Sequence, residues 1–210
     1  MTRDIVVKCI LLTSALALTA PIVAQISPAQ VVQNINLLTQ KSQALQAPAQ
    51  SITIVNGPLI IVGLGPFPPL IAGFTDIVST ATTALAQMDG MPPVPSGAQS
   101  DAIFDAFREF VCVHQVLFNI LIGKAGLFQT VPIIGQPVAA VLRQIEAIVD
   151  TVAFNLIENV QSRSSDLQAQ AQSLSGTIEA AINSYDGVSV SRREILRSLG
   201  FARREIAVAA

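Results

Sequence analysis

Few side chains in this sequence could carry out chemistry, and the most suggestive pair is Cys112 and His114. The chain has one histidine and two cysteines, and it has no Gly-x-Ser-x-Gly, His-Glu-x-x-His, Cys-x-x-Cys or glycine-rich phosphate motif. Cys112 and His114 stand two residues apart in a predicted helix, so their side chains diverge by about 200° and cannot form a nucleophile–base pair locally. We interpret Cys112 as a small buried hydrophobic residue.

Three carboxylates recur every four residues at the start of the same predicted helix: Asp101, Asp105 and Glu109. One helical face holding three acids could mimic a metal site or an acid–base cluster, but no histidine accompanies them on that face. The helix dipole favours negative charge in the first turns. We therefore interpret the three acids as a solvated helix start, and we expect no enzymatic activity, no metal site and no cofactor.

His114 falls in the middle of an apolar stripe that also carries Phe107, Phe110, Leu117 and Leu121. A polar group in such a place needs a hydrogen-bond partner or a cavity. It could bond the carboxylate of a bound fatty acid, or it could be a core histidine satisfied by the backbone or by another side chain. We favour the second reading, because buried polar groups in proteins are usually satisfied internally.

The elements that must position these residues belong to an unusually apolar chain. Of its 210 residues, 51% are hydrophobic and 12% are charged; the net charge is −2 and the mean hydropathy is +0.57. This composition excludes an intrinsically disordered chain and suits one domain with a real core. A slightly acidic balance with no Trp and one Tyr argues against nucleic-acid binding. Contact with membranes, surfaces or lipids is the first hypothesis.

Helical periodicity predicts an all-α fold, a single-domain bundle of about five helices. Ser27 and Pro28 are typical of a helix start, and Pro48 of a helix end. Ser100 is expected to cap the long helix that carries His114, and Pro137 to precede the next helix. The five predicted helices cover about 28–48, 69–88, 101–121, 138–156 and 164–185.

A Pro/Gly-rich apolar segment connects the first two predicted helices. No residue from Ser42 to Thr75 is charged, but glycines and prolines interrupt the segment, so we predict no transmembrane span. Exposed apolar patches usually mark interaction sites. This segment is therefore the natural contact for a hydrophobic surface, through Leu59, Ile60, Ile61, Leu64 and Phe67.

The two ends of the chain differ from its middle. Residues 1–24, with Arg3 and Lys8 before a short apolar run, are typical of a secretory signal peptide; an uncut anchoring helix is the alternative. Cleavage after Ala24 would leave residues 25–186 as the helical domain, with Cys112 as the single cysteine and no internal disulfide. We expect a secreted, extracellular protein, with cell-wall association as a further possibility.

Residues 187–210 carry a net charge of +3, whereas residues 25–186 carry −6. Arginines alternate there with Ile195, Leu196 and Leu199. Three readings stay open: a basic amphipathic helix that touches an anionic membrane or a partner, a disordered end, or an artefact of the gene model.

Several features together resemble the fungal hydrophobic surface-binding protein A family, which includes cell-wall galactomannoproteins. They are the signal peptide, the first helix from Val31 to Leu45, the pattern from Leu121 to Phe128, and the closing helix with Leu174, Ile178 and Ile182. The resemblance implies a secreted all-α bundle that adsorbs to hydrophobic surfaces or holds fatty acids between its helices, without an enzymatic motif. The chain departs from the family in its Pro-rich middle and its basic end, and it lacks a Ser/Thr-rich linker and a GPI signal, so we expect release rather than wall anchoring.

Two functions follow, and both bury apolar groups. The first is a non-enzymatic protein that binds hydrophobic surfaces through the domain 25–186. The alternative is a lipid or fatty-acid carrier with a cavity between its helices. Expected partners are hydrophobic solids or lipids, and a secreted enzyme as a further candidate. The predicted ligand-binding residues are Phe104, Phe107, Val111, His114, Phe118, Leu121, Val149 and Phe154.

Overall fold

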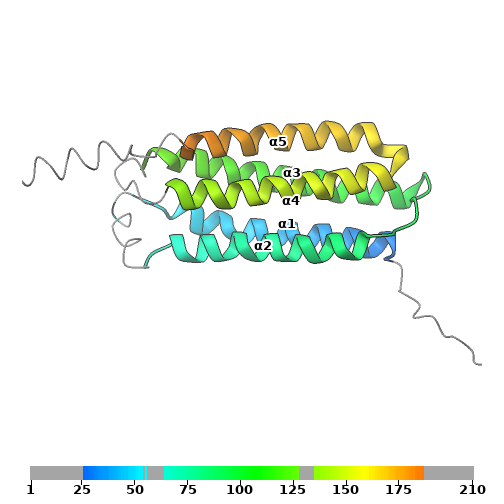
Figure 1. The fold of residues 1–210 in the computed structure, drawn as a ribbon, viewed down its shortest axis with the longest axis horizontal. Helices are drawn as coiled ribbons and strands as arrows, with labels where there is room; N and C mark the ends of the chain where they lie inside the picture. The colour runs from blue at the N-terminus through cyan, green and yellow to red at the C-terminus, as the bar shows by residue number, and fades with distance from the viewer. Residues whose placement is uncertain (1–25, 54, 56–63, 128–134, 187–210) are drawn as a thin grey trace, which may run out of the picture.

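The computed structural model describes residues 26–53, 55, 64–127 and 135–186. These residues form an all-α bundle and contain no strand, as predicted. Figure 1 shows the five long helices lying side by side along the long axis of the molecule. The elements are α1 (Pro28–Gln50), α2 (Phe67–Met88), α3 (Ala98–Ala125), α4 (Gly135–Asn159), the short 3-10 helix η3 (Gln161–Arg163) and α5 (Ser164–Asp186).

The five helices close into a ring. α1 packs against α2 and α3, α2 also packs against α4, and α5 completes the ring by packing against α4 and α3. Each helix therefore has two main neighbours and turns a third face toward a shared interior. Sequence neighbours are not always neighbours in space, because α3 lies beside α1 and α5 rather than beside α2 and α4.

The first helix shows where local signals hold and where tertiary packing overrides them. Ser27 caps α1 as predicted, since its Oγ accepts a hydrogen bond of 3.2 Å from the backbone N–H of Gln30. The predicted end at Pro48 is wrong, because α1 continues through the proline to Gln50. Pro48 lacks the N–H that would bond the preceding turn. Burial of Ala49 and Ile52 in the core favours continuation past it.

The other boundaries shift by a few residues. α2 begins at Phe67, before the predicted Pro69, and α4 begins at Gly135, ahead of Pro137. The N-cap residue of α3 is Gly97 and not the predicted Ser100. Ser100 lies in the first turn, where its hydroxyl donates to the carbonyl oxygen of Gly97 and accepts from the N–H of Gly97. Gly97 adopts φ 129°, a conformation that side-chain-bearing residues rarely adopt.

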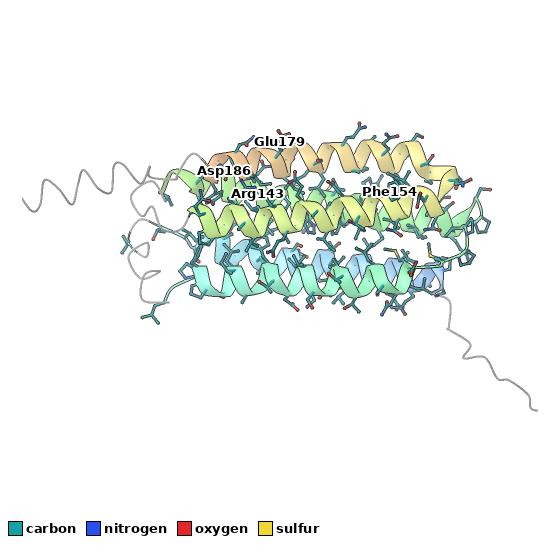
Figure 2. All side chains as sticks on the ribbon, viewed as in Figure 1. Arg143, Phe154, Glu179 and Asp186 are labelled. Carbon is teal, nitrogen blue, oxygen red and sulfur yellow. The ribbon has the colours of Figure 1, made fainter. Side chains whose placement is uncertain are left out.

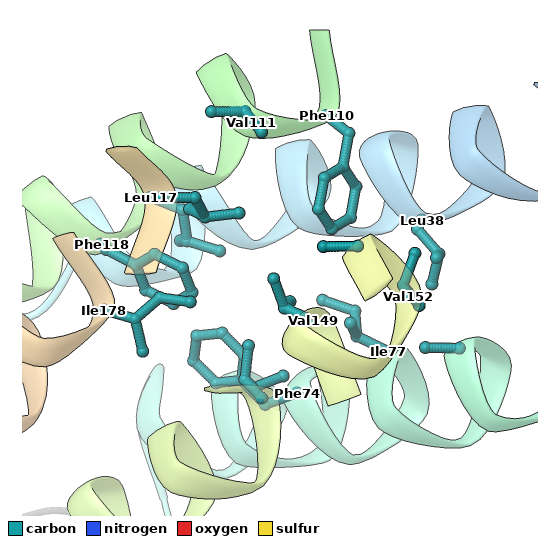
Figure 3. Packing of buried hydrophobic residues seen from close by; sticks show 14 of the residues in the cluster. Leu38, Phe74, Ile77, Phe110, Val111, Leu117, Phe118, Val149, Val152 and Ile178 are labelled. Carbon is teal, nitrogen blue, oxygen red and sulfur yellow. The ribbon is translucent and has the colours of Figure 1, made fainter. Parts of the chain in front are cut away.

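The interior of the ring is apolar. Figure 3 shows aromatic and aliphatic side chains of all five helices meeting there, with Phe74, Phe118 and Ile178 among them. By length and composition, two described helices, α2 and α3, could cross a membrane. Each also turns an apolar stripe into this core. The buried polar side chains in the described part of the chain are Thr39, Ser42, Ser100 and His114, together with the hydroxyl-bearing Tyr185.

Candidate functional site

A small, partly open void lies between side chains of α1, α2, α3 and α4. Its volume is about 10 Å³, the room of about one water molecule. Side chains of four helices converge on it, as Figure 3 shows for Leu38, Ile77, Phe110 and Val149. Every lining residue is apolar, so a water molecule would find no side-chain partner there. The lining residues are Leu38, Ile77, Ala81, Phe110, Ile148, Val149 and Val152.

The structure brings most of the predicted ligand-binding residues into the core but few to the void. The core holds Phe107, Val111, His114, Phe118, Leu121 and Val149. Of these, Val149 alone borders the void. The sequence places Phe110 on the apolar stripe of His114, but Phe110 is not among the predicted ligand-binding residues. The α1 and α2 contributors were not predicted, because no local pattern shows which helix faces which.

Two predicted pocket residues lie outside the core. Phe154 is 59% exposed, so the expectation that it lines a cavity is not met. The helical angle explains this, since Phe154 is about 200° around α4 from the buried Val152. Phe104 is half-buried at the edge of α3. The guanidinium of Arg163 stands 5.3 Å from its ring centroid, which is cation–π geometry.

His114 is completely enclosed between α3 and α1. Its Nδ1 lies 2.8 Å from the carbonyl oxygen of Phe110, and its Nε2 lies 2.8 Å from Oγ of Ser42. A backbone carbonyl only accepts hydrogen bonds, so in the neutral ring Nδ1 carries the hydrogen and Nε2 accepts from the serine hydroxyl. The same hydroxyl lies 3.0 Å from the carbonyl oxygen of Leu38, so two acceptors share its one hydrogen. The rings of Phe110 and Phe118 cover it at centroid distances of 3.9 and 5.9 Å.

Both ring nitrogens of His114 are thus used within the protein. It is a core histidine satisfied by a side chain and by the backbone, the second of the two readings. Burial lowers its pKa from 6.5 to about 4, because the apolar surroundings disfavour the charged ring; the hydrogen bond with Phe110 opposes this shift but does not cancel it. The imidazole is therefore neutral at pH 7.

The predicted surface-contact residues divide into two groups. Leu64 is 59% exposed, as a contact residue requires, whereas Phe67 is buried as the first residue of α2. The prediction for Phe67 is wrong because the helix starts earlier than expected and turns this ring into the core. Leu59, Ile60 and Ile61 lie outside the described residues.

The remaining candidates for chemistry are surface groups. Cys112 is exposed, so its interpretation as a buried residue is wrong. The 200° that separates it from His114 already implied this, because a buried His114 sends Cys112 to the opposite face. Asp101 and Asp105 form ion pairs with Arg163 and Arg108. In the described parts of the chain, no three or more His, Cys, Asp or Glu side chains gather as a metal site would require.

A second hollow lies on the surface between α1 and α2. Its volume is about 230 Å³, and it opens to solvent. The side chains of Asn34 and Gln87 close one part of it with a hydrogen bond of 2.8 Å. The threonine hydroxyls of Thr80 and Thr83 donate to the backbone of their own helix. Polar and apolar side chains share the lining of this hollow, whereas the lining of the void between the helices is wholly apolar.

Comparison with known proteins shows a shared fold. No family model matches the chain, and no curated protein sequence matches it. Solved structures do match. Ligand-binding domain 2 of the MP1 protein of Penicillium marneffei, in complex with arachidonic acids, is similar with a TM-score of 0.64 and 16% identity over 79% of this chain and 96% of that domain. Ligand-binding domain 1 of the same protein, complexed with arachidonic acids, gives a TM-score of 0.59 and 17% identity over 75% of this chain and 95% of that domain.

Proposed function

We propose that this chain is a secreted, non-enzymatic carrier of fatty acids or similar lipids, which it binds inside the five-helix ring. The observation that carries the proposal is the apolar interior where α1, α2, α3 and α4 meet, with seven apolar residues around the small void there. An acyl chain gains about 25 cal/mol for each Å² of apolar surface that leaves water. The MP1 domains that share this fold are described in complex with arachidonic acids, which supports the same ligand class here.

An acyl chain needs far more space than the present void, so binding must enlarge it. α2 is the helix whose movement would do this, since its residues Ile77 and Ala81 face those of α1, α3 and α4 across the void. The described polar links from α2 to α1 are exposed: the ion pair of Lys41 with Asp76 and the hydrogen bond of Asn34 with Gln87. Exposed links of this kind hold a helix weakly. We therefore infer that α2 moves outward as the ligand enters.

The hydrophobic surface-binding function remains a second candidate, and one observation favours it. Val55 and Leu64 are 88% and 59% exposed, and they stand on either side of the apolar stretch 56–63. Large exposed apolar side chains next to such a stretch suit adsorption to a solid. The resemblance of the sequence to the hydrophobic surface-binding family supports this second candidate. Under this proposal the protein is secreted and associates with the cell wall.

Native mass spectrometry of secreted protein, before and after organic extraction, separates the two candidates. The carrier predicts a discrete adduct of fatty-acid mass that disappears on extraction and returns when arachidonic acid is added, saturating at one or two molecules. Protein that takes up no lipid but leaves solution onto hydrophobic beads, in proportion to bead area, would overturn the carrier and favour surface binding.

Two matched variants of α2 test whether the lipid binds inside the ring. Ala81 lines the void, whereas Ala72 lies on the exposed face of the same helix. Ala81→Val adds volume to the interior at an overpacking cost of about 1–3 kcal/mol, so we expect lipid affinity to fall by roughly tenfold or more. Ala72→Val should leave it unchanged. Equal affinities in two folded variants would show that the ligand does not occupy the interior.

A further inference from the structure

The outer face of α4 carries an exposed aromatic residue between carboxylates. Phe154 is the third of four residues in a row with Glu146, Asp150 and Glu158, at intervals of four residues. Phe154, Asp150 and Glu158 are exposed, and Glu146 is half-buried. Figure 2 shows Phe154 on α4, away from the end where Arg143 and Asp186 meet. We call these four residues the α4 row.

The charges of the described bundle leave this row uncompensated. Every described cation is engaged elsewhere: four pair with carboxylates outside the row, and Lys124 donates to the carbonyl oxygens of Gln50 and Ile52. Six described carboxylates have no ion pair, and half of them belong to the α4 row. Like charges four residues apart on a helix repel each other, so the row favours a cationic occupant. The six are Asp89, Glu109, Glu146, Asp150, Glu158 and Glu179.

The C-terminal sequence has the matching pattern. Arg193, Arg197 and Phe201 follow one another at intervals of four residues, and Arg204 comes three residues later. In a helical conformation these residues would share one face. Their order is cation, cation, aromatic, cation, whereas the α4 row reads acid, acid, aromatic, acid. Both rows have nearly the same length, about 18 Å along α4 and about 17 Å in the C-terminal segment at 1.5 Å per residue.

The end of α5 lies close to the beginning of the α4 row. α5 ends at Asp186, whose carboxylate pairs with Arg143 of α4. Arg143 lies one turn before Glu146, the first residue of the α4 row. The six residues 187–192 can span up to about 20 Å, which is enough to reverse direction. A segment leaving Asp186 and turning back would therefore start beside the beginning of the row and run parallel to α4.

We propose that the segment 193–204 docks in cis on the α4 row. Arg193 and Arg197 oppose Glu146 and Asp150, Phe201 packs on Phe154, and Arg204 opposes Glu158. This docking removes Phe154 from water and relieves the repulsion along α4. It is independent of the proposed lipid binding, because it uses the outer face of α4 and none of the residues around the void.

Zero-length cross-linking of the full chain tests the proposed register. Arg197→Lys keeps the charge and places a primary amine opposite Asp150, with Glu146 one turn away. A carbodiimide should join this introduced amine to one of these carboxylates as an amide within a single chain. The Lys41–Asp76 ion pair serves as an internal positive control. Links from the introduced amine only to other carboxylates would overturn the proposal. Links between differently isotope-labelled chains would also overturn it and assign the row to a second copy.

Tryptic cleavage within 193–204 gives an independent readout. Replacing Glu146 and Asp150 by Gln and Asn should accelerate this cleavage about fivefold, because each exposed ion pair contributes a fraction of a decade to the docked population. The control variant Asp89→Asn/Glu109→Gln removes the same charge from residues outside the row. Equal rates in the two variants would overturn the proposal. Protection that appears only when anionic vesicles are added would also overturn it, in favour of membrane binding by the segment.

Discussion

The buried imidazole of His114 should make the stability of the bundle depend on pH between about 6.5 and 4. The folded state holds this ring neutral, with a pKa lowered to about 4 by burial, whereas the unfolded chain has the ordinary value of 6.5. Between these two values the unfolded state binds a proton that the folded state does not bind. The free energy of unfolding therefore falls as the pH falls, and the loss is complete below pH 4.

The size of the effect follows from the pKa difference. Each pH unit in the window costs about 1.4 kcal/mol, so the folded state loses about 2 kcal/mol between pH 7.5 and pH 5 and about 3 kcal/mol by pH 4. This is a large share of the stability of a typical domain. The relevant quantity is the difference in the free energy of unfolding between the wild type and a variant that lacks the imidazole, because the wild type alone sums the contributions of all titrating groups.

A variant without the imidazole isolates the contribution of His114 to the pH dependence of stability. The sequence has one histidine, so His114→Phe removes every histidine titration from the chain. Urea unfolding followed by circular dichroism at pH 7.5, 6 and 5 gives the free energy of unfolding of each protein. The difference between wild type and His114→Phe should change by about 2 kcal/mol between pH 7.5 and pH 5, in favour of the variant at low pH.

Ser42→Ala is the matched control, since it removes the partner of Nε2 but keeps the buried ring. It should lower stability at every pH and retain most of the pH dependence. A wild-type minus His114→Phe difference that stays constant from pH 7.5 to pH 5 would refute the reasoning, because it would mean that the folded state protonates His114 as easily as the unfolded state does.

Three further predictions concern single contacts. A Cβ at Gly73 would overlap Cδ2 of Leu45, so Gly73→Ala should destabilise the wild type but stabilise a Leu45→Ala background, with a coupling free energy of about 1–2 kcal/mol in a double-mutant cycle measured by urea unfolding. Tyr185→Phe removes the hydroxyl that donates to the carbonyl of Leu121 at 2.9 Å and should lower the free energy of unfolding by about 1 kcal/mol, whereas no change would mean that this bond is replaced by another. The exposed Cys112 should react with an aromatic disulfide reagent in the native protein nearly as fast as in urea, and slow native labelling would show that another surface covers it.

The sequence predicted the helices well because their signals are local. The apolar spacing of each helix and the cap at Ser27 depend on residues within a few turns, and they located five helices to within a few residues. The same periodicity placed His114 in the core. It failed at Pro48, where burial of Ala49 and Ile52 prolongs the helix, and at Phe67, where the connecting segment becomes helical earlier than its prolines suggest.

Only the tertiary structure decided which helices are neighbours and what they enclose. The partner of His114 is Ser42, 72 residues away on another helix, and no pattern around either residue identifies the other. The void is likewise built by single side chains from four helices, so its lining depends on the order of the ring. An apolar stripe predicts that one face of a helix is buried, but it does not identify the helix that covers this face. The reason is that the hydrophobic effect is non-directional and favours any apolar partner. The chain alone therefore determined an apolar helical bundle with a buried histidine, and the packing of its helices determined the closed ring, the void and the exposed face of α4.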